Sequence, residues 1–143
     1  MTRAAGILMS ITSLPGKYGI GCFSKEAYAF VDWLKDAGQT FWQILPIHPT
    51  SYGDSPYQSF STFAGNPYLI DLEALIEEGV LTREECDAVD FGSADHDIDY
   101  EALYNGRYPL LRKAYERSDI SKNAEYQQFL AENRWWLDDY ALF

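Results

Sequence analysis

The sequence contains only two cysteines, Cys22 and Cys86, and no long uninterrupted apolar run. Two cysteines are too few for a disulfide framework, and these lack the close pairing of a zinc knuckle, so we expect reduced structural thiols. A membrane span needs roughly 18 consecutive apolar residues, and residues 1–10 lack the apolar run and cleavage site of a secretory signal. We therefore expect a cytoplasmic protein with no membrane partner and no metal ion.

Positively charged residues are also scarce. The chain has 11 lysines and arginines against 22 aspartates and glutamates, a formal net charge of −11. Such a surface repels a phosphate backbone, which argues against a nucleic-acid partner. Residues 1–70 carry four basic and four acidic groups, whereas residues 71–143 carry seven and eighteen, so the excess lies in the second half. Solvated helix faces explain this excess more simply than a cation site does.

Apolar residues make up 47% of the chain, enough for a buried core. Gly6–Ile11 is nearly all apolar, which predicts a strand buried on both faces. A helix is expected between Ser24, placed to cap its start, and Gly38, placed to end it. Thr40–Leu45 is β-branched, aromatic and apolar, which predicts a second strand. Together these segments have the size of a parallel βαβ unit. The expected inward positions of the helix are Ala27, Phe30, Val31, Leu34 and Ala37.

The alternation stops after this unit. Residues 51–66 are rich in Ser, Gly, Pro and aromatic residues, which predicts a long structured loop. Residues 68–72 are expected to be extended, and residues 72–80 helical as far as Gly79. Thr82 and Glu85 have the capping-box spacing that begins another short helix. Residues 98–118 are expected to be helical, with Gly106 and Pro109 making the first part a separate turn or a kink.

A final helix is expected near the C-terminal end. We also expect the chain to be the N-terminal piece of a larger enzyme. A (β/α)8 barrel takes about 250 residues, and only two clear strands are present. We therefore predict an α/β fold, the N-terminal portion of a (β/α)8 TIM barrel with an inserted, mostly helical subdomain. Residues 1–50 would form the first βαβ unit, and residues 51–143 the substrate loop and helical insertion. The predicted inner face of the final helix comprises Tyr126, Phe129, Leu130, Asn133, Leu137 and Tyr140.

The loops that follow the two strands are where a βα barrel places its chemistry. The first loop lacks the glycine register of a phosphate-binding loop, and neither a Ser-His-Asp arrangement nor an HExxH motif is present. His48, at a strand end before a proline, is more simply a structural histidine than a proton shuttle. His96 lies in an acidic run and is expected to be solvated.

The second loop combines tyrosines, hydroxyls and amides with almost no charge, which suits a neutral sugar. A sugar ring has an apolar face that can lie on an aromatic ring, and hydroxyls that need hydrogen-bond donors and acceptors. Tyr57 could supply the platform, Ser55, Gln58 and Asn66 the rim contacts, and Asp54 an acceptor. Composition alone favours the simpler alternative, a self-packed loop whose tyrosines and phenylalanines plug into the core.

Six sequence blocks bear a resemblance to a known family. They are Gly6–Leu8 through Ser13–Gly16, Tyr18–Gly21, Trp42–Pro46, Pro49–Thr50, Tyr52–Ser59 and Phe63–Leu72. In this order and spacing they resemble the N-terminal part of the 4-α-glucanotransferases, or amylomaltases. The resemblance runs from about Arg3 to Phe143. His48 and Cys22 depart from the family's usual residues but lie outside the expected sugar contacts.

This resemblance implies transfer of an α-1,4-glucan segment to the 4-hydroxyl of an acceptor sugar by a retaining mechanism without a cofactor. In such a mechanism one carboxylate forms a covalent glycosyl intermediate and a second acts as acid and then base. The family's essential carboxylates would lie beyond Phe143, so no acid of this chain is expected to be catalytic. Tyr57 would stack near the sugar at the cleavage point, with Ser55 and Asp54 close by and Asn66 supporting the loop.

Two other functions remain possible from the sequence. The first is a non-catalytic carbohydrate-binding module that keeps the loop, and the second is an amylase-like hydrolase. In every case the expected partners are α-1,4-glucans, namely maltooligosaccharides and starch or glycogen chains.

Overall fold

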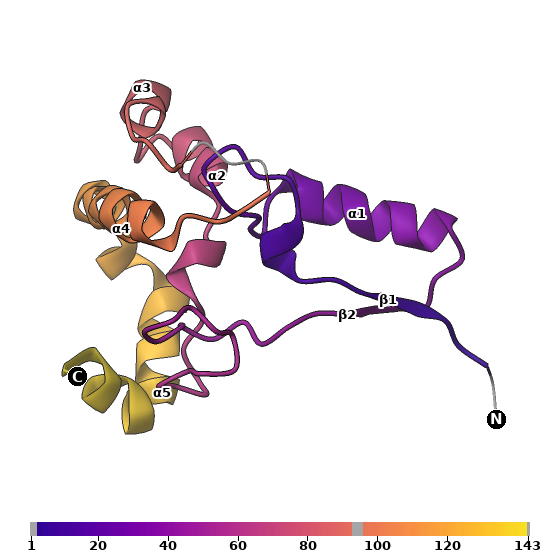
Figure 1. Ribbon diagram of the computed structural model, residues 1–143. Helices are drawn as coiled ribbons and strands as arrows, with labels where there is room; N and C mark the ends of the chain where they lie inside the picture. The colour runs from indigo at the N-terminus through magenta and orange to yellow at the C-terminus, as the bar shows by residue number, and fades with distance from the viewer. Residues whose placement is uncertain (1–2, 93–95, 143) are drawn as a thin grey trace.

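The computed structural model describes residues 3–92 and 96–142. Strand β1 (Gly6–Leu8) pairs in parallel with β2 (Phe41–Gln43), with Gly6 opposite Phe41. Helix α1 (Lys25–Asp36) connects them and packs on β2, where the rings of Phe30 and Trp42 meet edge to face at 4.9 Å. The predicted βαβ unit is therefore confirmed (Figure 1).

The strands differ from the prediction in length and burial. β1 ends at Leu8, and the 3-10 turn η1 (Ile11–Ser13) takes the place of the predicted strand end. The Ser10 hydroxyl caps this turn by accepting from the Thr12 amide, which diverts the backbone from the ladder. The prediction that the strand is buried on both faces is wrong for this chain, since Leu8 is 61% exposed. Each strand has a single strand neighbour among the described residues, so little covers its faces.

Helix α1 begins and ends where local signals predicted. Ser24 occupies the N-cap, although its hydroxyl donates to the Glu26 carboxylate at 2.6 Å instead of accepting from the helix. Gly38 has a φ of 71°, the left-handed conformation that ends helices at low cost in glycine. Ala27 and Leu34 are buried as predicted, whereas Val31 is 49% exposed.

The middle of the chain contains short helices. The loop of residues 51–66 has no helix or strand, as expected, and the 3-10 turn η2 (Pro67–Leu69) follows it. The predicted extended piece at 68–72 is confirmed only at Ile70 and Asp71, because the Asn66 side chain accepts from the Tyr68 amide and starts a turn, and α2 begins at Leu72. Helix α2 (Leu72–Glu77) precedes Gly79, and α3 (Arg83–Asp87) begins with the predicted capping box of Thr82 and Glu85.

Helix α4 (Tyr100–Arg117) runs through Gly106 and Pro109 as one helix, so the predicted separate turn is wrong, and the alternative of a kink stays a prediction. Its buried face explains this continuity, since Leu103, Leu110 and Ala114 are at most 5% exposed. Gly106 is required by close packing, because a Cβ there would lie 2.5 Å from Val89 Cγ1.

The turn η3 (Ile120–Lys122) and helix α5 (Ala124–Leu142) complete the described chain. The predicted inner face of α5 is half-buried except for Phe129, which is 45% exposed.

The core consists of two clusters. The larger joins α2, α3 and α4 around Leu72, Cys86 and Leu103, and the smaller joins η1 and α1 around Ile11 and Ala27. In Figure 1 the strand pair and α1 project to one side of the helices α2 to α5. Both cysteines are buried and free, and burial raises the pKa of the Cys22 thiol to about 11. No helix of the described residues is long and apolar enough to cross a bilayer.

Candidate saccharide-binding site

The loop after β2 is shaped by two consecutive turns. The Asp54 amide donates to the Ser51 carbonyl at 3.0 Å, and the Gln58 amide donates to the Ser55 carbonyl at the same distance. A third bond, from the Ser51 amide to the Gln58 carbonyl, closes residues 51–58 into a compact loop. Gly53 and Asp54 both have positive φ, 94° and 55°, which aspartate tolerates better than most residues.

Tyr57, the predicted platform, stands at the tip of this loop with its side chain 73% exposed. The interpretation that it plugs the loop into the core is therefore wrong for Tyr57. Its amide lies 3.4 Å from the Ser55 hydroxyl, so Ser55 supports the turn that presents the ring.

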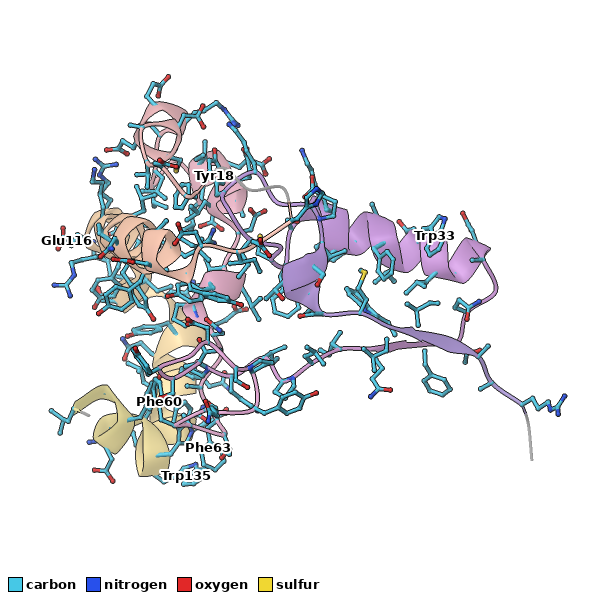
Figure 2. All side chains as sticks on the ribbon, viewed as in Figure 1. Tyr18, Trp33, Phe60, Phe63, Glu116 and Trp135 are labelled. Carbon is cyan, nitrogen blue, oxygen red and sulfur yellow. The ribbon has the colours of Figure 1, made fainter. Side chains whose placement is uncertain are left out.

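The phenylalanines of the loop contact α5 but remain more than half exposed, Phe60 at 52% and Phe63 at 56%, so they do not plug into the core either. The ring of Phe63 meets the ring of Trp135 edge to face at 4.8 Å (Figure 2). The ring of Phe60 stacks with that of Tyr140 at 6.2 Å. The phenylalanines of the loop therefore contact a helix, whereas its tyrosines are more exposed, Tyr52 fully and Tyr57 at 73%.

Asn66 is committed to the backbone. Its backbone N–H donates to the Ile47 carbonyl at 2.8 Å, and its side-chain oxygen accepts from the backbone N–H of Tyr68 at 3.0 Å. The side-chain NH2 has no bond to another described residue and can still donate. These contacts fit a residue that supports the loop.

The structure places Asp54 and Asn66 in an open groove of about 870 Å³. We call it the tyrosine groove, because Tyr52, Tyr68, Tyr100, Tyr104 and Tyr108 all line it. One wall is the loop from Thr50 to Asp54, and the facing wall is the first half of α4. Ser55, Tyr57 and Gln58 do not line this groove, so the structure does not bring all five predicted contacts together.

The three tyrosines of α4 that line the groove were missed by the sequence reasoning, whereas the fourth, Tyr115, does not line it. Tyr100, Tyr104 and Tyr108 recur every four residues, which places them on one helix face. The signal was present in the sequence, but the expected break near Gly106 and Pro109 concealed it.

The rings of the groove pack against one another at angles that leave faces and edges accessible. Tyr104 and Tyr108 lie 5.0 Å apart at 57°, and Tyr68 meets Tyr108 at 5.8 Å and 68°. Burial raises the pKa of Tyr68 to about 12, and the neighbouring Tyr108 and Asp54 act in the same direction. Burial also raises the pKa of Tyr100 and of Tyr108. The phenols are therefore neutral donors and acceptors beside apolar ring faces.

Neither histidine joins this site. His48 Nδ1 lies 3.3 Å from the Ala64 carbonyl, a contact that ties the strand end to the loop. His96 lines a separate polar groove near η1. Across residues 3–92 and 96–142, no three carboxylate, imidazole or thiol side chains are grouped to hold a metal ion.

The chemistry of the tyrosine groove is that of a site for a neutral polyhydroxylated ligand. A family profile described as 4-alpha-glucanotransferase matches residues 9–143, and the chain belongs to this family. It is 50% identical over 135 residues to the 4-alpha-glucanotransferase of Clostridium butyricum, covering 94% of this chain and 28% of that protein. It is 46% identical over 147 residues to that of Thermus thermophilus, covering 100% and 28%.

A solved structure supports the same assignment. The chain matches the amylomaltase from Streptococcus agalactiae in complex with acarbose with a TM-score of 0.84 and 47% identity, covering 94% of this chain and 28% of that one. The predicted family is confirmed, and the chain has the fold of the corresponding part of that enzyme. It spans about 28% of the length of these relatives.

Proposed function

We propose that this chain is the N-terminal, substrate-binding segment of a 4-α-glucanotransferase. The longer protein would transfer an α-1,4-glucan segment to the 4-hydroxyl of an acceptor glucose or maltodextrin. The observation that carries this proposal is the tyrosine groove, with Asp54 and Asn66 on one wall and aromatic rings on the other, in a chain that belongs to the family throughout residues 9–143.

The proposed architecture is that of the sequence prediction. Residues 1–50 begin a (β/α)8 barrel, and residues 51–143 form a helical subdomain that carries the substrate loop. The parallel pairing of β1 and β2 around α1 supports the barrel, because each βα repeat of a barrel has this form. A cytoplasmic location stays a prediction.

In this proposal, carboxylates beyond residue 143 carry out the cleavage and formation of glycosidic bonds. A retaining mechanism forms a covalent glycosyl intermediate, which the 4-hydroxyl of an acceptor sugar then attacks. The role of this chain is to hold glucan. Tyr57, 73% exposed at the loop tip, offers a ring face to a sugar, and Ser55, Asp54 and Gln58 shape the turn that presents it. Asn66 supports the loop.

The test is the product pattern of the full-length protein incubated with maltotriose. A transferase yields glucose together with a ladder of longer oligosaccharides, because one sugar chain is extended while another is shortened. An amylase-like hydrolase yields glucose and maltose without the ladder. Binding of maltooligosaccharides without any turnover would instead support a carbohydrate-binding module. Either of these two results would contradict the proposal.

A further inference from the structure

Arg107 is the most deeply buried charged side chain among the described residues, with 1% of its surface exposed. It lies on α4 three residues after Tyr104 and next to Tyr108, yet it is directed away from the tyrosine groove and does not line it. Helix α4 therefore presents aromatic rings to the groove and a guanidinium to the core.

The guanidinium joins α4 to two other segments through backbone carbonyls. Nη1 donates to the carbonyl of Tyr18 at 3.1 Å, and Nη2 donates to the carbonyl of Ile70. Tyr18 belongs to the loop between η1 and α1, and Ile70 connects η2 to α2. Ile70 follows Tyr68 by two residues, and Tyr68 contributes its ring to the groove.

The bond to Ile70 ties α4 to the segment that contributes Asn66 and Tyr68 to the groove. Tyr68 lies in the turn η2, which Asn66 caps at its start and Ile70 at its end, and the Ile70 amide donates to the Pro67 carbonyl. A shift of α4 would stretch the bond to Ile70 and move Tyr104 and Tyr108 relative to Asn66 and Tyr68.

The burial of this cation is costly for the fold. Loss of solvation lowers the pKa of the guanidinium, and the neighbouring Cys22 and Asp71 act in the opposite direction. Nε has no hydrogen-bond partner among the described residues. An apolar side chain of similar volume can often replace a buried ion at little cost in stability. However, an apolar side chain cannot supply two directional hydrogen bonds to carbonyls of different segments.

We propose that Arg107 is a positioning residue for the glucan groove, which holds the tyrosine wall of α4 against the turn η2, the source of the Tyr68 ring, through the carbonyls of Ile70 and Tyr18. This inference rests on the proposed function, since it takes a glucan to be the ligand of the groove.

The test uses the full-length protein with Arg107→Met, Arg107→Lys and a control, Arg112→Met, on the exposed face of the same helix. We measure kcat and KM for maltoheptaose, with the folded fraction determined by circular dichroism at the assay temperature. Arg107→Met is expected to raise KM by about fivefold, the loss expected for misplaced aromatic contacts, with kcat changed less than about twofold. Arg107→Lys should recover part of the loss, since an ammonium can donate to one carbonyl but cannot bridge both as the planar guanidinium does. Arg112→Met should match the wild type.

A double-mutant cycle separates positioning from general stabilisation. If Arg107 acts through the tyrosine wall, replacing Tyr104 and Tyr108 together by alanine should make Arg107→Met nearly silent in KM. Multiplicative effects of the two changes would overturn the inference. So would an unchanged KM in a folded Arg107→Met protein or, where that variant does not fold, in Arg107→Lys. A wild-type protein that neither transfers nor binds glucans would instead overturn the proposed function itself.

Discussion

Both carboxylate oxygens of Glu73 accept hydrogen bonds from the Arg83 guanidinium, at 2.8 Å from Nη1 and 2.7 Å from Nη2. This bidentate pair joins the first turn of α2 to the first residue of α3. The hydroxyl of Tyr18 donates to the same carboxylate at 3.2 Å, so the contact also reaches the loop after η1.

The Glu73 pair predicts a pH-dependent stability. The hydrogen bonds from Arg83, opposed by partial burial, lower the pKa of Glu73 to about 2. A carboxyl group with a lowered folded-state pKa stabilises fully above its unfolded value of about 4.3, and loses that contribution as the pH falls towards 2. We expect the pair to contribute about 1 kcal/mol to the free energy of unfolding at neutral pH. The contribution is modest because Arg83 is half exposed and solvent weakens the interaction.

The measurement is thermal unfolding of the full-length protein and of Glu73→Gln between pH 7 and pH 3. The difference in Tm should be constant above pH 5 and shrink below it, with Glu77→Gln on the exposed side of α2 as the control. A difference that stays the same down to pH 3 would show that the pair does not contribute.

Two glycines with left-handed backbones predict contrasting effects of alanine. Gly19 has a φ of 79°, and a Cβ there would lie 2.7 Å from Phe91 Cβ and 2.8 Å from the Phe91 carbonyl oxygen. Gly38 has a φ of 71°, but a Cβ there meets nothing within 4 Å. Gly38→Ala should cost about 1 kcal/mol of backbone strain, and Gly19→Ala roughly 3 kcal/mol, since the clash adds to the strain. Urea unfolding measures both, and equal losses would contradict the packing of Phe91 on the loop.

We predict that removing the Tyr57 ring lowers activity without lowering stability. Because its ring is 73% exposed, Tyr57→Ala should change the free energy of unfolding by less than about 0.5 kcal/mol. Loss of a stacking surface should lower kcat/KM for maltotriose by about tenfold, with kcat falling as well if stacking tightens in the transition state. Tyr57→Phe should be milder.

Tyr28→Ala provides a matched control for Tyr57, since Tyr28 on α1 is also 73% exposed. It should leave kcat/KM unchanged. A Tyr57→Ala protein with wild-type kcat/KM and a lowered Tm would remove Tyr57 from the binding site.

The apolar surface of the βαβ unit predicts self-association of the 143-residue chain in isolation. Leu8 and Phe41 on the strands are 61% and 62% exposed, and Trp33 on α1 is 57% exposed (Figure 2). Exposed large apolar side chains of this kind favour aggregation or a partly molten state. Sedimentation velocity should show oligomers, and a hydrophobic dye should bind. A monomer with a sharp cooperative melt would contradict this prediction.

Much of the local structure could be predicted because its causes lie within a few residues. The capping box of Thr82 and Glu85, the left-handed Gly38 and the composition of the loop at 51–66 each act over one turn of chain. The predictions that were wrong depended on partners elsewhere. Helix α4 continues through Pro109 because distant apolar residues cover its buried face, and β1 is exposed because the described chain supplies only one neighbouring strand.

The same distinction holds for the candidate site. The sequence by itself determined the family, the parallel βαβ unit and the neutral, aromatic chemistry of the loop, because these follow from residue types and their spacing. Only the tertiary structure decided that Asp54 and Asn66 face the tyrosines of α4, that Tyr57 stands outside their groove, and that Arg107 is bonded to a carbonyl 89 residues earlier. Such contacts depend on the path of the chain through space, and no local spacing encodes which distant carbonyl a buried guanidinium will reach.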